Sequence, residues 1–329
     1  MTEVTHRIVE TNGIRMYIAE QGRGPLVVLC HGFPESWYSW RRQIRALAEA
    51  GFHVVAPDMR GYGQTDRPEA IEAYTLLHIV GDMVGLLDAL SVEHAVIAGH
   101  DWGALVAWQA ALLRPDRFRA VIGLSVPFLP LTLLPPTSAM PQTDDAVFYQ
   151  LYFQEPGVAE AEMEHDLQKY LRGILYGYSG DGRRGQRGLP AERQAGMIPR
   201  KGGLRSLIDN AFQPATLPNW ITKADVDFYV AEFARTGMRG GLNWYRNIDR
   251  NRELLAPFAG LQVTVPALFI VGDRDPTLAF SDRREYIANP SRFVPQLRDT
   301  IMLPGCGHWT QQERAAEVSA AMIDFMRHL

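Results

Sequence analysis

Short apolar runs that alternate with helical segments constrain the fold of this chain more than any other feature. The continuous β-rich runs are "LVVLC" (26–30), "HVVAPDM" (53–59), "AVIA" (95–98) and "AVIGLS" (120–125). Segments with helical spacing of apolar residues lie between these runs, at 40–51, 74–90 and 103–113. Continuous apolar runs are typical of strands buried on both faces. Strands that alternate with helices predict a parallel sheet with right-handed crossovers.

Further strands are expected at both ends of the chain. "HRIVETNGIRMYIAEQG" reads as two alternating strands around the turn signal Asn12-Gly13. Near the other end, "PALFIVGDRD" (266–275) and "DTIMLPGCGHW" (299–309) predict two more strands, and 313–329 predicts a closing helix. The α/β pattern therefore occupies the first and last parts of the chain.

The middle of the chain has a different character. From about Pro127 to Ala259 the strand–helix alternation is absent, and helical segments at 158–177 and 223–236 take its place. A polar, glycine-rich loop, "SGDGRRGQRG" (179–188), separates them. We predict an α/β core (1–127 and 260–329) into which a helical cap (128–259) is inserted.

Composition narrows the function classes. The chain of 329 residues is 47% hydrophobic and 21% charged, which is typical of a globular protein, and its length suits one large α/β domain with an insertion. A net charge of −4 leaves no basic footprint for nucleic acid. No apolar run reaches the roughly 18 residues of a membrane span, and the N-terminal sequence lacks the apolar core of a signal peptide. Cys30 and Cys306 form no disulfide framework or metal-site spacing. We expect a cytoplasmic protein without a structural metal.

"GHDWGA" (99–104) is the first candidate site. It follows a predicted strand and precedes a predicted helix, and it has the outline of a nucleophile elbow. Asp101 stands where an esterase or lipase has serine. The alternative is that Asp101 only caps the helix that begins near Trp102, which is a common role for aspartate.

Two other predicted strands end in candidate partners. Asp273 and Asp275 end one of these strands, and His308 lies in a glycine-flanked loop after the last one. The order nucleophile, acid, histidine is that of the α/β-hydrolases. A helix-capping aspartate or a surface histidine is ordinary, but three such residues, each after its own strand, favour a catalytic triad.

With these motifs the chain resembles the α/β-hydrolase-fold epoxide hydrolases over nearly its whole length. The resemblance depends on five motifs: "HGFPESWYSWRRQ" (31–43), "GHDWGA", "YQLYFQEPGVAEAE" (149–162), "LNWYRN" (242–247) and "GCGHWTQ" (305–311). The first, second and last also occur, with variations, in haloalkane dehalogenases, whereas the two cap motifs are more specific to epoxide hydrolases. The resemblance implies an α/β-hydrolase fold: a mostly parallel sheet, flanking helices and an inserted helical cap.

A carboxylate nucleophile indicates the type of carbon that is attacked. Attack by Asp101 on an ester would give an anhydride, whereas attack on a saturated carbon gives an alkyl ester that water hydrolyses later. The resemblance assigns activation of that water to His308 and orientation of His308 to Asp275, with Asp273 the less favoured acid. The fold implies that the backbone N–H groups of Phe33 and Trp102 form the oxyanion hole.

The leaving group separates an epoxide from a halide. A ring-opened epoxide leaves as an alkoxide, whose conjugate acid has a pKa of about 15–16 by comparison with water. Tyrosine, at about 10, gives up its proton downhill by about five pKa units, or ~7 kcal/mol. The resemblance identifies Tyr149 and Tyr245 as the proton donors, and Tyr152 is the local competitor. Dehalogenases commonly carry asparagine where Phe33 stands, and a phenylalanine side chain cannot hydrogen-bond a halide.

We therefore predict an epoxide hydrolase that uses no metal and no organic cofactor. Its expected partners are a small apolar epoxide and water. We expect four aromatic side chains to line an apolar site: Trp37, Phe128, Trp244 and Trp309. The alternatives are a haloalkane dehalogenase and, from another class, a non-catalytic small-molecule receptor. A receptor would be expected to have a broken triad.

Overall fold

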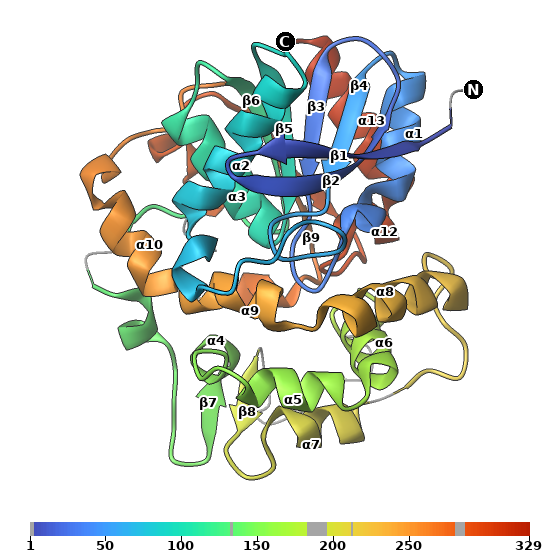
Figure 1. Cartoon of the computed structure of the whole chain (residues 1–329), viewed down its shortest axis with the longest axis vertical. Coiled ribbons are helices and arrows are strands. Elements are labelled where there is room, and N and C mark those ends of the chain that lie inside the picture. The colour runs from blue at the N-terminus through green and yellow to red at the C-terminus, as the bar shows by residue number, and fades with distance from the viewer. Residues whose placement is uncertain (1–2, 132–133, 183–195, 212, 280–286) are drawn as a thin grey trace.

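The core of the protein is one eight-stranded sheet (Figure 1). The computed structural model describes residues 3–131, 134–182, 196–211, 213–279 and 287–329. The strand order is β1-β2-β4-β3-β5-β6-β9-β10, with β2 antiparallel to its two neighbours and the other pairs from β4 to β10 parallel. The strands are β1 Thr5–Thr11, β2 Ile14–Gln21, β3 Leu26–Cys30, β4 His53–Pro57, β5 Ala95–His100, β6 Phe118–Leu124, β9 Ala267–Gly272 and β10 Leu297–Leu303. The predicted, mostly parallel sheet is confirmed.

The predicted hairpin at the start of the chain is also confirmed. β1 and β2 pair with Thr11 opposite Ile14, which leaves Asn12 and Gly13 as the two-residue turn. Both turn residues have positive φ, 44° and 77°. A type I′ turn needs positive φ at both positions, and Asn-Gly is its preferred sequence.

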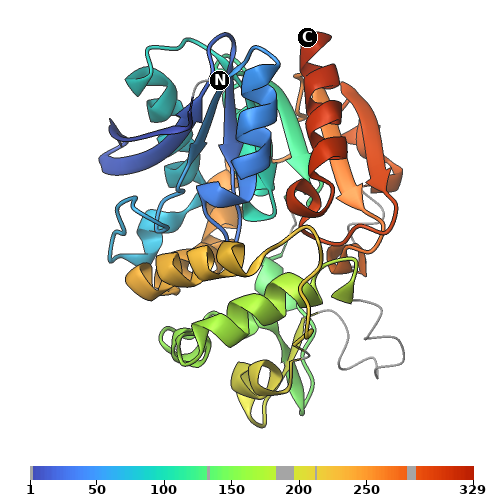
Figure 2. The same ribbon diagram turned by 90° about the vertical axis from the view of Figure 1, so that its right-hand side faces the viewer.

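Helices cover both faces of the sheet, and the two faces have separate apolar clusters. α1 (Arg41–Glu49) and α13 (Ala315–Arg327) lie together on one face, as Figure 2 shows. α2 (Leu76–Ala89) and α3 (Trp102–Leu113) cover the other face. In β3, Val27 and Leu29 belong to the α1–α13 cluster, whereas Val28 and Cys30 belong to the α2–α3 cluster. Because side chains alternate along a strand, one apolar run serves both layers.

One predicted helix is broken. The segment 158–177 forms α5 (Val158–Glu164) and α6 (Leu167–Gly177), because Asp166 starts a new helix by accepting a hydrogen bond from the Lys169 N–H at 2.9 Å. Uninterrupted apolar spacing masked this break. The predicted closing helix, 313–329, is confirmed as α13, and Arg314 (φ −127°, ψ 48°) separates it from the short α12 (Thr310–Glu313).

The elements between β6 and β9 lie at one end of the sheet (Figure 1). In chain order they are η3 Pro136–Ala139, β7 Ala146–Phe148, α4 Tyr149–Tyr152, α5, α6, β8 Met197–Pro199, α7 Gly203–Asn210, α8 Lys223–Thr236, α9 Arg239–Arg246, α10 Ile248–Leu255 and η6 Ala256–Phe258. Shorter turns in the core are η1 Trp37–Trp40, η2 Ile71–Tyr74, η7 Pro276–Ala279 and η8 Pro290–Arg292. The cap limits at 128 and 259 stay a prediction.

The cap contains a small sheet that was not predicted from the sequence. β7 and β8 form a two-stranded antiparallel sheet in which Val147 pairs with Ile198. Each strand has three residues, too short for a periodic signal.

Most of the glycine-rich loop, 183–188, lies outside the described residues. Within the described part of the chain, no helix combines the length and apolar character that crossing a membrane requires.

Candidate active site

Asp101 occupies a strained turn between β5 and α3. Its φ of 53° and ψ of −120° are unfavourable for a residue with a side chain, by on the order of 1–3 kcal/mol. The turn also needs its two glycines. A Cβ on Gly99 would collide with the carbonyl of Gly103, and a Cβ on Gly103 would collide with that of Cys30. The side chain of Asp101 makes no capping hydrogen bond to α3, so the helix-cap alternative is not supported.

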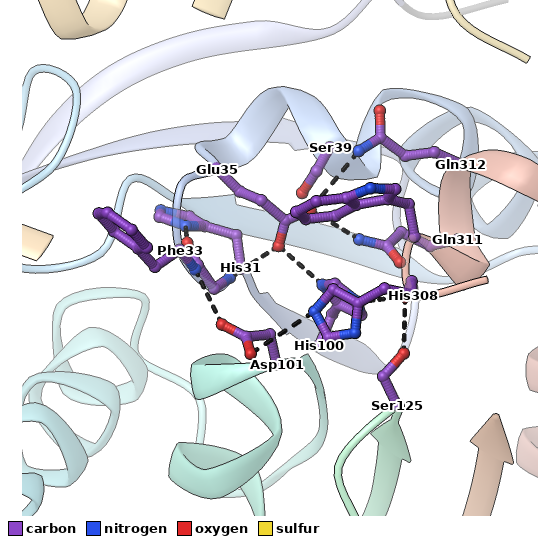
Figure 3. Close-up of polar contacts among 12 residues, drawn as sticks. His31, Phe33, Glu35, Ser39, His100, Asp101, Ser125, His308, Gln311 and Gln312 are labelled. Atoms are coloured by element: carbon purple, nitrogen blue, oxygen red, sulfur yellow. Dashed lines mark hydrogen bonds and ion pairs between the residues drawn. The ribbon is translucent and has the colours of Figure 1, made fainter. Parts of the chain in front are cut away.

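The two oxygens of Asp101 have different surroundings (Figure 3). Oδ1 accepts a hydrogen bond from the backbone N–H of Phe33 at 3.0 Å. Oδ2 lies 3.6 Å from Nε2 of His308. Gly32 permits this approach, because a Cβ there would clash with Asp101. Trp102 is the first residue of α3, so its N–H has no acceptor within the helix.

Asp275, and not Asp273, contacts the histidine. The Nδ1 atom of His308 lies 3.2 and 3.1 Å from the two carboxylate oxygens of Asp275. Asp275 is fully buried and also accepts a hydrogen bond from the Thr277 N–H at 2.8 Å. Asp273 instead accepts from the Gly305 N–H at 2.7 Å, at an exposed position. The structure therefore brings together Asp101, His308 and Asp275 from the ends of β5, β10 and β9.

Charge stabilises this arrangement. Burial acts against the imidazolium form of His308, but Asp275 and then Asp101 outweigh it and raise the pKa of His308 to about 10. Burial also acts against the two carboxylates, yet the facing imidazole lowers the pKa of both Asp101 and Asp275. In the resting site His308 is therefore a cation between two anions.

Tyr149 and Tyr245 meet above this site. Tyr149 begins α4 and Tyr245 lies in α9, and their ring centroids are 5.9 Å apart at an interplanar angle of 73°. The ring of Tyr245 contacts those of Trp102 and Phe33 at 5.0 and 5.6 Å. Burial, and next the charge of Asp101, raise the pKa of Tyr245 well above its ordinary value. Tyr245 thus lies beside the residues whose amides flank Asp101, and Tyr149 packs against Tyr245.

Tyr152 is turned to a different partner. Its hydroxyl donates to Oε2 of Glu162 at 2.9 Å. Burial and this carboxylate raise the pKa of Tyr152 to about 12. The structure therefore favours Tyr149 over Tyr152 as the partner of Tyr245.

Comparison with known proteins agrees with this geometry. A family model described as alpha/beta hydrolase fold matches residues 25–315. The chain is 48% identical over 331 residues to Epoxide hydrolase A of Mycobacterium tuberculosis, which covers 99% of this chain and 98% of that protein. It is 41% identical to Epoxide hydrolase 3 of Siraitia grosvenorii, with 99% of each chain covered. The chain belongs to the α/β-hydrolase-fold epoxide hydrolases.

A solved structure supports the same conclusion. The crystal structure of Epoxide Hydrolase A from Mycobacterium thermoresistibile matches with a TM-score of 0.89 at 47% identity, over 99% of this chain and 98% of that one. The fold and the family predicted from the motifs of this epoxide hydrolase are confirmed.

Two of the predicted lining residues lie against the triad or its amides. The ring of Trp309 packs on that of His308 at 4.9 Å, while its N–H donates to the Leu175 carbonyl at 2.8 Å. The ring of Trp244 lies 6.0 Å from that of Trp102, and its N–H donates to the Arg60 carbonyl at 3.1 Å. Both indoles are buried and hydrogen-bonded, so they support site residues.

The other two lie among different neighbours. Trp37 packs edge-on against His6 and Phe228, at 4.8 and 6.0 Å. Phe128 packs near Trp108 and lines an apolar pocket that Phe269, Phe293 and Val294 also line. None of these neighbours is a triad residue, so the structure does not place Trp37 or Phe128 at the triad. Apolar composition alone could not separate the walls of the site from ordinary core.

A buried pair that was not predicted from the sequence, Glu35 and His100, lies behind the triad (Figure 3). Both side chains are fully buried, and Oε2 of Glu35 lies 2.7 Å from Nδ1 of His100. The other ring nitrogen, Nε2, donates to the backbone carbonyl of His308 at 2.7 Å. The Ser125 hydroxyl donates to the same carbonyl at 2.7 Å. Two donors thus fix the main chain at His308.

Glu35 is held as an anion. Burial acts to raise its pKa, but His100, with its charge and its hydrogen bond, and the Gly32 N–H outweigh burial and lower it. The amide of Gln311 donates to the other carboxylate oxygen at 2.9 Å. In the sequence these residues are the glutamate of "HGFPE" and the histidine of "GHD". Neither periodicity nor spacing indicates that they are partners.

The loop that carries His308 is also tied to the cap. The His308 N–H donates to the Tyr178 carbonyl at 2.8 Å. Oε2 of Glu313 accepts from the N–H groups of Gly307 and Gly180, at 2.9 and 2.8 Å.

In the part of the chain that the structure describes, no three His, Cys, Asp or Glu side chains are arranged to hold a metal ion.

Proposed function

We propose that this epoxide hydrolase converts a small apolar epoxide and water into a vicinal diol through an ester on Asp101. The observation that carries the mechanism is the unequal environment of the two Asp101 oxygens. Oδ1 is held by the Phe33 N–H, and Oδ2 faces His308. One oxygen is thus placed to remain a carbonyl, and the other is available for attack.

In the first step, Oδ2 attacks an epoxide carbon. The new C–O bond forms as the ring C–O bond breaks, and the ring oxygen takes a proton from the tyrosine pair. An ordinary phenol is a stronger acid than the alcohol that forms by about five pKa units, which favours this transfer. Asp101 becomes a neutral ester whose carbonyl oxygen, Oδ1, is still hydrogen-bonded to Phe33.

The second step starts from the loss of that negative charge. Asp101 is one of the two groups that raise the pKa of His308, so ester formation makes the imidazolium more acidic. His308 releases its proton to solvent, and the phenolate takes up a proton from solvent, so the two transfers balance. The neutral imidazole then takes a proton from a water molecule as that water attacks Cγ of Asp101.

The intermediate of this step carries its charge on Oδ1. The Phe33 N–H already points at that atom, and the Trp102 N–H is the second donor of the proposed oxyanion hole. Loss of one such donor typically costs about 2.7–4 kcal/mol of transition-state stabilisation. As the intermediate collapses, the diol oxygen leaves and takes the proton from His308. The acid left on Asp101, which carries a water-derived oxygen, then returns its proton to His308.

Neither alternative function has an observation in its favour. Dehalogenation needs a hydrogen-bond donor for the halide, and the Phe33 side chain packs on Tyr245 and cannot donate. A non-catalytic receptor is expected to have a broken triad, whereas His308 contacts both of its partners. The apolar character of the substrate and the cytoplasmic location expected from the two cysteines remain part of this proposal.

The test combines substrate choice with capture of the ester. The purified protein is given a terminal epoxide or a chloroalkane of similar size, and diol and chloride are measured. Diol without chloride is expected, and chloride without diol would contradict the proposal. His308→Gln should then accumulate an adduct of protein mass plus epoxide mass. His94→Gln, at an exposed histidine, is the matched control and should turn over normally.

A further inference from the structure

Gln150, the residue next to Tyr149, hydrogen-bonds a phenol of the site. The Nε2 atom of Gln150 donates to the hydroxyl oxygen of Tyr149 at 2.9 Å. A hydrogen bond that a phenol oxygen accepts is strengthened when the phenol becomes a phenolate, because the acceptor gains charge. Donation to that oxygen therefore favours proton release. It also fills one acceptor position on the oxygen and restricts where the O–H can point.

The backbone around Gln150 is fixed relative to both tyrosines. The amide of Gln154 donates to the Gln150 carbonyl at 2.7 Å and to the Tyr245 carbonyl at 3.0 Å. One side chain thus ties α4 to α9. The Tyr149 N–H donates to the Gly196 carbonyl at 2.8 Å, which anchors the start of α4. The Gln150 amide is therefore aimed at Tyr149 by a braced segment.

Tyr245 has a different environment. It is buried, with 4% of its surface exposed, and it packs between Trp102, Phe33 and Phe153. Burial and the charge of Asp101 both oppose a phenolate there, as its raised pKa indicates. The hydrogen bond from the side chain of Trp102 lowers the pKa of Tyr245, but it offsets the rise only in part. The two phenols therefore have different surroundings, because Tyr149 accepts the Gln150 amide whereas Tyr245 is enclosed by aromatic rings.

We propose that Gln150 is a positioning residue that makes Tyr149 the tyrosine which releases its proton to the epoxide oxygen, while Tyr245 stays protonated as a hydrogen-bond donor. The inference rests on the proposed function and divides the work of the pair. As the ring opens, the O–H bond of Tyr149 breaks and the new O–H bond forms on the ring oxygen. The phenolate left on Tyr149 keeps the Gln150 N–H as its donor.

The test is a double-variant comparison of the ring-opening step. Gln150→Met removes the amide and keeps the length of the side chain. Rapid quench and intact mass follow ester formation in the His308→Gln background, where the ester accumulates. Gln150→Met should slow ester formation by roughly tenfold or more. Gln150→Glu should slow it further, because a carboxylate can only accept the phenol proton and so competes with the epoxide oxygen.

The decisive arm uses the two phenylalanine variants. In a Tyr149→Phe background, Gln150→Met should have no further effect, whereas in a Tyr245→Phe background its full effect should remain. Equal slowing in both backgrounds would overturn the proposal, and so would a normal rate in Gln150→Met or in Gln150→Glu. Gln168→Met, at an exposed glutamine in α6, is the matched control and should be silent.

The proposed function is tested separately in the same series. The protein without substitutions at 149, 150 or 245 must first form the ester. If it forms none, the proposed function itself fails, and this inference fails with it. If it forms the ester and the double variants are additive, only the role of Gln150 is wrong.

Discussion

The Nε2 atom of His308 lies 3.6 Å from Oδ2 of Asp101, so the base and the nucleophile of the proposed mechanism face each other directly. With Asp275 on its other side, the imidazole holds a proton well above neutral pH, at a pKa of about 10. A protonated histidine cannot activate water. In the proposed mechanism, His308 becomes able to act as a base when ester formation removes the charge of Asp101.

Asp101→Asn reproduces the neutral state of the ester without substrate. Because it removes one of the two carboxylates that raise the pKa of His308, we expect that pKa to fall from about 10 toward the ordinary value near 6.5. Nitrogen chemical shifts of the labelled imidazole, followed by NMR against pH, measure it. An unchanged pKa in Asp101→Asn would show that Asp275 alone sets the charge of His308.

Asp275→Asn should damage the hydrolytic step. The amide cannot stabilise the imidazolium as a carboxylate does, and it can hold the ring in the wrong tautomer, so ester hydrolysis should slow by at least roughly a hundredfold. Single-turnover kinetics give the rate of each step. Asp273→Asn is the matched control, because the Asp273 carboxylate accepts from the Gly305 N–H at an exposed position, and this variant should hydrolyse the ester near the normal rate. The reverse result would reassign the acid.

The three triad residues could be predicted from the geometry of a parallel sheet. Asp101, Asp275 and His308 each follow a strand, and the carboxyl ends of parallel strands meet at one edge. Glu35 and His100 could not be predicted in the same way. Their contact depends on the turn at 31–35 and on the neighbouring positions of β3 and β5, which no local pattern encodes.

In the cap, the sequence carried less information. β7 pairs with β8 across about fifty residues, and each strand is too short to show a period. Trp37 and Trp309 were equally aromatic in the sequence, but only Trp309 packs on His308. Tertiary packing, and not residue type, decides which aromatic ring reaches the triad.

Glu35→Gln should destabilise the protein in a pH-dependent way. Breaking a buried charged pair costs about 3 kcal/mol or more. The pKa of Glu35 is lowered in the folded protein, so its stabilisation is present above pH ~4.5, the ordinary value, and is lost as the pH falls through the lower folded value. The difference in free energy of unfolding between the parent protein and Glu35→Gln should therefore shrink in acid.

Urea unfolding between pH 3 and 8, roughly, measures this difference. Glu49→Gln, at an exposed position on α1, should change the free energy of unfolding by less than about 0.5 kcal/mol. A Glu35→Gln protein as stable as its parent at neutral pH would rule out the buried pair as a support of His308.

The tyrosine pair separates epoxide from halide chemistry. Tyr149→Phe and Tyr245→Phe should each slow ring opening without abolishing it, and the double variant should be nearly inactive with its fold intact by circular dichroism. Tyr152→Phe should be near normal, since that hydroxyl is engaged with Glu162. If Tyr152→Phe is damaging and Tyr149→Phe is silent, the donor is misassigned. Normal ring opening in the double variant would remove the proton-donor argument altogether.

The covalent ester on Asp101 is the central claim, and a single turnover in ¹⁸O-labelled water tests it most directly. With enzyme in excess, water attacks Cγ of Asp101, so the first diol should carry an unlabelled oxygen from the carboxylate. The label should then appear in the peptide that contains Asp101, by mass spectrometry. Label in the first diol, with none on Asp101, would mean that water opens the epoxide directly, and the ester mechanism would be wrong.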